Sequence, residues 1–179
     1  VVIDDFTTAG GASLNSVNTG VDTFAGAGIL GGERDLELNV LSNPLGQYVD
    51  VAVVAAGLQV VSNGFLTSSE VSFQYDGAGD EVGNTGLGKT LNHMGAGANL
   101  GLAGNDRIRL KFLGNDLDVK VYATLRKAGA ILSSTMIVRP AASGAGDVDI
   151  MMNPADMAMA DSVTPMFKAD PSGHVPLKN

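Results

Sequence analysis

The chain has 179 residues, 45% of them hydrophobic, with 24 glycines and no cysteine; this suffices for one domain with a core and excludes disulfides, thiolate metal sites and catalytic thiols. Nineteen acidic residues against eleven basic ones give a net charge of -8, so we expect neither nucleic acid nor an anionic membrane as a partner. No run of about 18 apolar residues occurs, and we expect no membrane insertion.

The N-terminal region is predicted to be an extended arm followed by loops. The segment Val1 to Phe6 opens with three β-branched residues and continues with a polar pair, which indicates a strand or an extended arm. Residues 7–32 are rich in small and polar residues without a clear period, and they indicate loops around one short strand.

Alternating and apolar segments predict strands between residues 34 and 75. Arg34 to Val40 places aliphatic side chains on one face and acidic or amide side chains on the other, as in a half-buried strand. Residues 48–61 are almost continuously apolar and predict a buried strand pair interrupted at Gly57. The dipeptide Asn63-Gly64 predicts a hairpin turn, and Glu70 to Tyr75 alternates again.

The segment from Gly104 to Val138 dominates the pattern. Residues 108–112 alternate strictly, and after Gly114-Asn115-Asp116 the alternation resumes through Leu125, which predicts a two-stranded antiparallel hairpin with one buried face. A second turn at residues 127–129 leads into a third strand. In the glycine-rich stretch before this segment, residues 76–105, we expect a short strand near residues 100–102, because long structureless loops are unusual in compact domains.

The C-terminal region is predicted to leave the domain. Residues 148–152 form a further short strand, and residues 153–160 form a helical turn or a loop. From Asp161 onward three prolines favour an extended tail and argue against a central strand. Eight to eleven strands without a convincing amphipathic helix predict an all-β protein: a jelly-roll-like antiparallel two-sheet β-sandwich over residues 1–160, with a Pro-rich tail over residues 161–179.

Four segments carry a family resemblance. They are IDDF at residues 3–6, ILGGERDLELNV at residues 29–40, FQYDG at residues 73–77 and LGLAGNDRIRLKFLGNDLDVKVYATL at residues 100–125. The arrangement resembles secreted bacterial surface and matrix proteins of the PEP-CTERM-associated type, although the sorting signal itself is absent. The resemblance implies a β-sandwich at the cell surface or in the extracellular matrix, and it carries over no functional residue.

Two glycine-rich segments match ligand-binding patterns. Residues 83–90 match the phosphate-loop pattern G-x-x-x-x-G-K-[ST], but that site needs a strand before it and a helix after it, and the flanking sequence indicates turns. Asp76, Asp80 and Glu81 place three carboxylates in a short loop, a composition that suits calcium. Asp147 and Asp149 form a second acidic pair, and for all these acids a solvated loop is the simpler interpretation.

No catalytic cluster is evident, because the chain has two histidines, no cysteine and no nucleophile elbow. We therefore expect a non-enzymatic extracellular structural protein that forms a homo-oligomer or polymer, such as a filament, sheath or matrix, by strand addition between subunits. The arm residues Val1, Val2, Ile3 and Phe6 are the candidate subunit contacts; the simpler alternative is that the arm pairs within its own sheet. The alternative function is a calcium-dependent carbohydrate-binding module, which the absence of Trp weakens.

Overall fold

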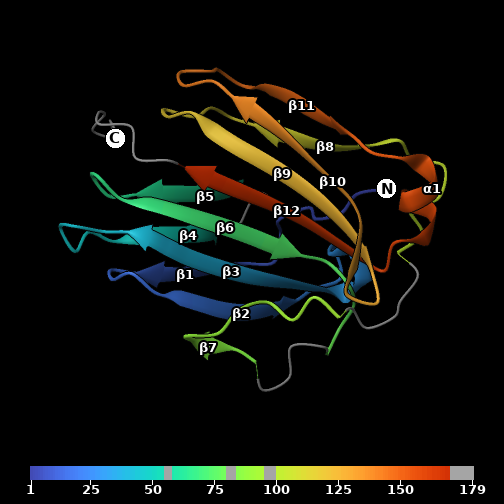
Figure 1. Ribbon diagram of the computed structural model, residues 1–179, viewed down its shortest axis with the longest axis horizontal. Helices are drawn as coiled ribbons and strands as arrows, with labels where there is room; N and C mark the ends of the chain where they lie inside the picture. Colours follow the sequence, from blue (N-terminus) through green and yellow to red (C-terminus); the bar gives the residue numbers. More distant parts are fainter. Residues whose placement is uncertain (55–57, 80–83, 95–99, 170–179) are drawn as a thin grey trace.

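The computed structural model describes residues 1–54, 58–79, 84–94 and 100–169, and it confirms the prediction of an all-β antiparallel sandwich (Figure 1). One layer is a seven-stranded sheet in the order β10-β9-β12-β6-β3-β2-β7. Its strands are β2 (Thr19–Ala25), β3 (Glu33–Ser42), β6 (Ser68–Gln74), β7 (Gly86–Leu87), β9 (Val119–Lys127), β10 (Ala130–Arg139) and β12 (Ser162–Ala169).

The second layer consists of two smaller sheets. One has the order β1-β4-β5, from β1 (Gly10–Leu14), β4 (Val49–Val54) and β5 (Leu58–Asn63), and the other pairs β8 (Arg107–Phe112) with β11 (Gly146–Met151). The helical elements are the 3-10 turn η1 (Leu30–Gly32) and the short helix α1 (Pro154–Met159), which the Asn153 side chain caps by accepting from the Ala155 backbone N–H.

The divided second layer produces two hydrophobic clusters. One lies among β8, β9, β11, β12 and α1, and the other lies among β3, β4 and β6. Ile3 and Phe167 pack against both clusters. The Phe167 ring also makes edge-to-face contacts, at 6.1 Å between centroids, with Phe73 of one cluster and Phe112 beside the other. Phe167 therefore joins the two halves of the core.

Period-two patterning placed most strands correctly. The structure confirms the strands predicted over residues 34–40, 70–75 and 148–152, the strand pair over residues 48–61, and the turn at residues 127–129 that joins β9 to β10. At that turn Ala128 and Gly129 both have positive φ, as a two-residue hairpin requires. Gly57 lies outside the described residues.

The predicted hairpin over residues 108–125 is wrong in its pairing. β8 pairs with β11, and β9 pairs with β10 and β12, so the turn at Gly114-Asn115-Asp116 crosses from one layer to the other. Ile108 and Leu125 nevertheless both line the same hydrophobic cluster, from opposite layers. Alternation specifies which face of a strand is buried, and it does not specify the neighbouring strand.

The hairpin predicted at Asn63-Gly64 is also wrong. β5 pairs with β4, and β6 pairs with β3 and β12, so this connection too links the layers. Gly64 is needed for a close approach: a Cβ there would lie 2.2 Å from the Cβ of Gln47. The Asn63 side chain accepts a hydrogen bond from the Ser69 hydroxyl at 2.7 Å.

Two loop predictions need correction. Residues 7–32 contain two strands, β1 and β2, because small residues such as Gly10 and Gly11 suit closely packed strands although they give no hydrophobic period. Leu100 and Leu102 are buried in the core without forming a strand, and the short strand of this stretch lies at β7 instead.

The predicted tail begins inside the sandwich. β12 is a central strand that pairs with β9 from Ser162 to Ala169, so the boundary at residue 161 is wrong. Pro165 interrupts only the ladder to β6, which runs from Met166 to Ala169 and resumes as a bridge between Val163 and Tyr75. Continuous pairing on the β9 side lets a central strand tolerate the missing proline N–H.

Candidate functional site

Three of the four segments that carry the family resemblance meet at a buried ion pair. Arg34 of β3 is fully buried, and its Nη1 donates to Asp4 Oδ2 at 2.7 Å while its Nη2 donates to the Thr8 carbonyl at 2.9 Å. Tyr75 directly follows β6, and its hydroxyl donates to the same Asp4 oxygen at 3.1 Å. Burial first, and then the Asp4 charge, raise the pKa of Tyr75 well above its ordinary value. The cluster holds the arm onto the sheets, since each of its three side chains bonds to another.

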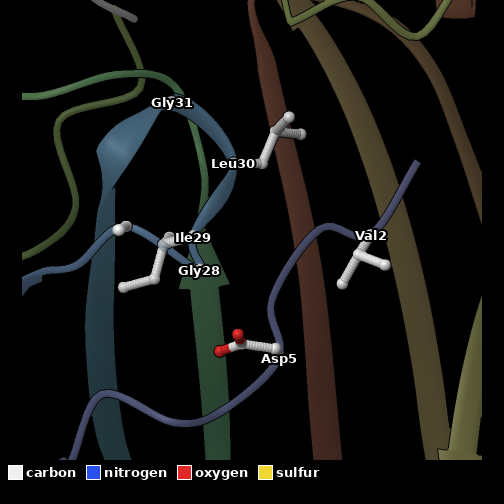
Figure 2. Close-up of a pocket in the computed structure, with 7 residues that line it drawn as sticks. Val2, Asp5, Gly28, Ile29, Leu30 and Gly31 are labelled. Carbon is white, nitrogen blue, oxygen red and sulfur yellow. The ribbon is translucent and has the colours of Figure 1, made fainter.

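A shallow hollow of about 420 Å³ lies beside this ion pair, between the arm and the segment before β3 (Figure 2). It is lined by Val2, Asp5, Ala27, Gly28, Ile29, Leu30 and Gly31. Asp5 is its ionisable side chain, and hydrogen bonds from the Thr7 hydroxyl and backbone N–H lower the pKa of this carboxyl. A Cβ at Gly28 would lie 2.2 Å from Asp5 Oδ2, so a side chain at residue 28 would displace the Asp5 carboxylate from this position. One carboxylate among apolar groups does not form a catalytic constellation.

The predicted subunit-contact residues divide into two kinds. Val1 and Val2 are 72% and 70% exposed, whereas Ile3 packs against both core clusters. Phe6 is half-buried with a φ of 53°, and its ring lies 5.8 Å from the Arg34 guanidinium carbon. The arm forms a single β-bridge, from Asp4 to Ile29, rather than a strand. Contact with a second copy through Val1 and Val2 stays a prediction.

The calcium site also stays a prediction. Asp76 is fully buried after β6, and its Oδ2 accepts a hydrogen bond from the Gln74 side chain, while Asp80 and Glu81 lie outside the described residues. Within the described part of the chain, no group of three or more acidic or histidine side chains is arranged to hold a metal ion. Of the three predicted calcium ligands, Asp76 is therefore the one that lies among the described residues.

The loop after Asp76 is held over the outer face of the large sheet by side chains from β3 and β6. Glu37 accepts from the Leu91 backbone N–H at 2.7 Å, and the Gln74 side-chain amide donates to the Asn92 carbonyl at 2.6 Å. The Gln74 amide oxygen lies 2.6 Å from His93 Nδ1. These polar groups hold residues 91–93 of the glycine-rich segment against the sheet.

The phosphate-loop pattern has the wrong structural context. Gly86 and Leu87 form β7, which pairs with β2 at one end of the large sheet. Lys89 and Thr90 follow as exposed residues, and among the described residues no helix begins directly after them. The nucleotide site that the pattern suggests requires its threonine at a helix start. The Gly83 position lies outside the described residues.

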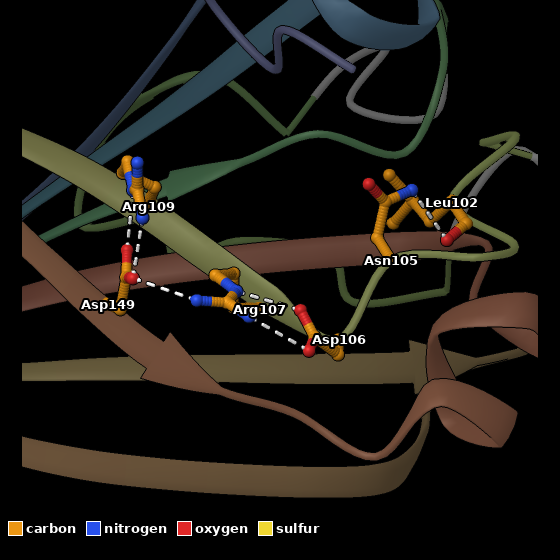
Figure 3. Close-up of polar contacts among 6 residues, drawn as sticks. All are labelled: Leu102, Asn105, Asp106, Arg107, Arg109 and Asp149. Atoms are coloured by element: carbon orange, nitrogen blue, oxygen red, sulfur yellow. Dashed lines mark hydrogen bonds and ion pairs between the residues drawn. The ribbon is translucent and has the colours of Figure 1, made fainter.

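The second acidic pair is engaged by arginines across the β8–β11 sheet (Figure 3). Asp149 accepts from Arg109 Nε at 2.6 Å and from Arg107 Nη1 at 3.1 Å, and the hydrogen bond from Arg109 lowers the pKa of Asp149 to about 2. Asp147 lies 3.7 Å from Arg109. Figure 3 also shows the Asn105 side chain donating to the Leu102 carbonyl, a hydrogen bond within the turn that precedes β8.

One feature that the sequence analysis missed is the free edge of β10. Among the residues that the structure describes, β10 pairs with β9 alone. Three of its side chains are exposed although they are apolar: Ile131 by 61%, Met136 by 47% and Val138 by 52%. The signal in the sequence was the uncharged run from Ala130 to Val138. An unpaired edge of this kind is a template for another strand.

Comparison with known proteins found no matching family model, no matching curated protein and no matching solved structure. In the described ranges no helix is long and apolar enough to cross a membrane.

Proposed function

We propose that this protein is a non-enzymatic structural protein of the cell surface or extracellular matrix that assembles with copies of itself by strand pairing. The observation that carries the proposal is the β10 edge. The extracellular setting rests on the resemblance of four segments to secreted bacterial surface proteins.

The β10 edge lacks the usual protection against pairing. Soluble β proteins cover their sheet edges or place charges, prolines or short strands there. β10 has ten residues, and Ala130 to Val138 contain no charge and no proline. Its protection is one bulge between Ile131 and Ser133. Such an edge favours association with another strand over solvation.

The opposite edge of the same sheet is protected. β7 covers Gly20 and Val21 of β2, and Asp22 is an exposed charge in the same strand. The Asp22 carboxylate also accepts from the Thr23 backbone N–H at 2.9 Å, which satisfies a donor at this edge. This contrast between the two edges supports β10 as the assembly edge.

The test compares two lysine variants by analytical ultracentrifugation and negative-stain electron microscopy. Wild type is expected to self-associate with rising concentration, and Val138→Lys is expected to remain monomeric, because a charge at an edge opposes strand addition. Leu45→Lys, at a turn residue that is 54% exposed, is the matched control and should assemble like wild type. A wild type that stays monomeric throughout would refute the proposal.

A further variant separates β10 from the arm. Val2→Lys changes an arm residue that is 70% exposed without touching Asp4 or Arg34. Assembly should survive this substitution if β10 is the contact. Loss of assembly in Val2→Lys together with normal assembly of Val138→Lys would instead assign the contact to the arm.

A further inference from the structure

We infer that β10 pairs antiparallel with β10 of a second copy across a two-fold axis, with Met136 opposite Met136. This inference rests on the proposed self-assembly, and it adds the partner strand, the symmetry and the register of the contact.

Backbone alternation identifies which β10 residues face the free edge. Val163 of β12 exchanges both backbone hydrogen bonds with Tyr75, so its neighbours Ser162 and Thr164 face β9. The residues opposite them on β9 are Arg126 and Thr124, which therefore face β12.

The same alternation continues across β9. Leu125, Ala123 and Val121 face β10 and lie opposite Ser133, Thr135 and Ile137. The remaining residues of β10 direct their backbone N–H and C=O groups away from β9; these are Ser134, Met136 and Val138.

Two features limit the length of the β10 edge that can pair with another strand. The bulge between Ile131 and Ser133 disturbs the strand at its start. At its end Arg139 is held inside the fold: its Nε donates to the Asn115 side chain at 2.7 Å, and its guanidinium carbon lies 4.6 Å from the Phe112 ring centre. The usable edge is therefore the segment between these two points.

A two-fold axis at Met136 uses this segment completely. It places Met136 opposite its own counterpart and Ser134 opposite Val138, so each outward-facing residue exchanges backbone hydrogen bonds with the second copy. A two-fold axis at a neighbouring residue would leave at least one of Ser134, Met136 and Val138 opposite the bulge or opposite a residue beyond Arg139. The matched length and reciprocal pairing are those of an isologous contact, which closes as a dimer.

Side chains and charge agree with this arrangement. Met136 lies beside Tyr122 on the outer face of the sheet, so an apolar pair from each copy would meet at the axis. Nine of the ten charged residues in residues 1–79 are acidic, and the sheet order places β3 and β2 at the opposite end from β10 (Figure 1). Pairing through β10 keeps these acidic regions apart, which lowers electrostatic repulsion between copies.

Cysteine cross-linking tests the register, because the natural chain contains no cysteine. Hydrogen-bonded antiparallel neighbours have Cα atoms about 5.5 Å apart, a separation that a disulfide spans. Under mild oxidation Met136→Cys should form a covalent dimer with itself. Ser134→Cys and Val138→Cys should each stay uncross-linked alone, since four residues along a strand separate like positions by about 13 Å, but an equimolar mixture of the two should cross-link.

Leu45→Cys measures random collision and should give no dimer above background. A Val138→Cys chain that cross-links with itself, or a Ser134→Cys and Val138→Cys mixture that does not, would overturn the register. If wild type associates in the ultracentrifuge while Met136→Cys stays uncross-linked, the two-fold contact fails and the proposed self-assembly stands. If wild type is monomeric at every concentration, both fail.

Discussion

At the scale of single residues, the ion pair between Asp4 and Arg34 fixes the N-terminal arm. Both side chains are almost fully buried, at 2% and 0% exposure. Breaking such a pair from one side leaves a charge in a medium that cannot solvate it. The pair gives the arm a structural purpose that its apolar first residues did not reveal.

Removing the Asp4 carboxylate should therefore destabilise the fold strongly. Asp4→Ala is expected to lower the free energy of unfolding by about 3 to 5 kcal/mol, measured by urea denaturation. Asp5→Ala, one residue along on an exposed carboxylate, is the control and should cost far less. Equal losses in the two variants would contradict the role assigned to the ion pair.

The His93 imidazole should make stability depend on pH. Burial, and secondarily the Arg126 charge, lower the pKa of His93 below 6.5 in the folded protein. The unfolded chain therefore binds the proton more readily, and stability present above about pH 6.5 is lost as pH falls toward the folded-state pKa.

Replacing His93 tests the predicted direction of this pH dependence of stability. Thermal melts of wild type between pH 7 and pH 5 should show a falling melting temperature, and His93→Gln, which cannot take up a proton, should show a smaller fall. An identical pH dependence in the two proteins would exclude His93 as the group responsible.

At the scale of elements, β12 unites the two halves of the protein. It inserts between β9 and β6, and its Phe167 contacts both hydrophobic clusters. Phe167→Ala should lower the free energy of unfolding by about 3 kcal/mol, because the cavity would open at the junction of the clusters. Phe65→Ala, at a ring that is 53% exposed, should cost less than about 1 kcal/mol. Chemical denaturation of both variants checks this, and similar costs would refute the joining role of Phe167.

The elements also show what a single sequence can and cannot predict. The buried faces of β3, β6 and β9 followed directly from alternating side chains. The pairing of β8 with β11 did not, because any alternating strand can satisfy the same face requirement with several neighbours. Pro165 misled the prediction for β12, since a proline removes one ladder bond and a central strand with another intact ladder can accept that loss.

The sequence did not indicate which side chains the candidate site residues contact in the fold. Asp76 as a calcium ligand and the arm residues as subunit contacts stay predictions, and the bond between Asp4 of the arm and Arg34 joins segments that are 30 residues apart. The β10 edge was visible in the sequence only as a run without charges, and its meaning depends on the strand order of the whole sheet.

At the scale of the whole molecule, the seven-stranded sheet, in the part of the chain that the structure describes, has one protected and one unprotected edge. β7 and Asp22 protect the β2 end, while β10 ends the sheet with apolar side chains exposed. A two-fold contact through β10 would join two large sheets into one and leave the arm, the hollow and the acidic regions at the outside. Growth beyond a dimer would then need a second contact, for which the exposed Val1 and Val2 are the available apolar residues of the arm.

Residue-resolved hydrogen exchange tests the central claim most directly. In dilute solution the amides of Ser134, Met136 and Val138 should exchange quickly while those of Thr135 and Ile137 are protected by β9. At concentrations where the protein associates, all five should become protected. Protection of Ser134, Met136 and Val138 already in the dilute monomer, or their continued fast exchange after association, would contradict assembly through the β10 edge.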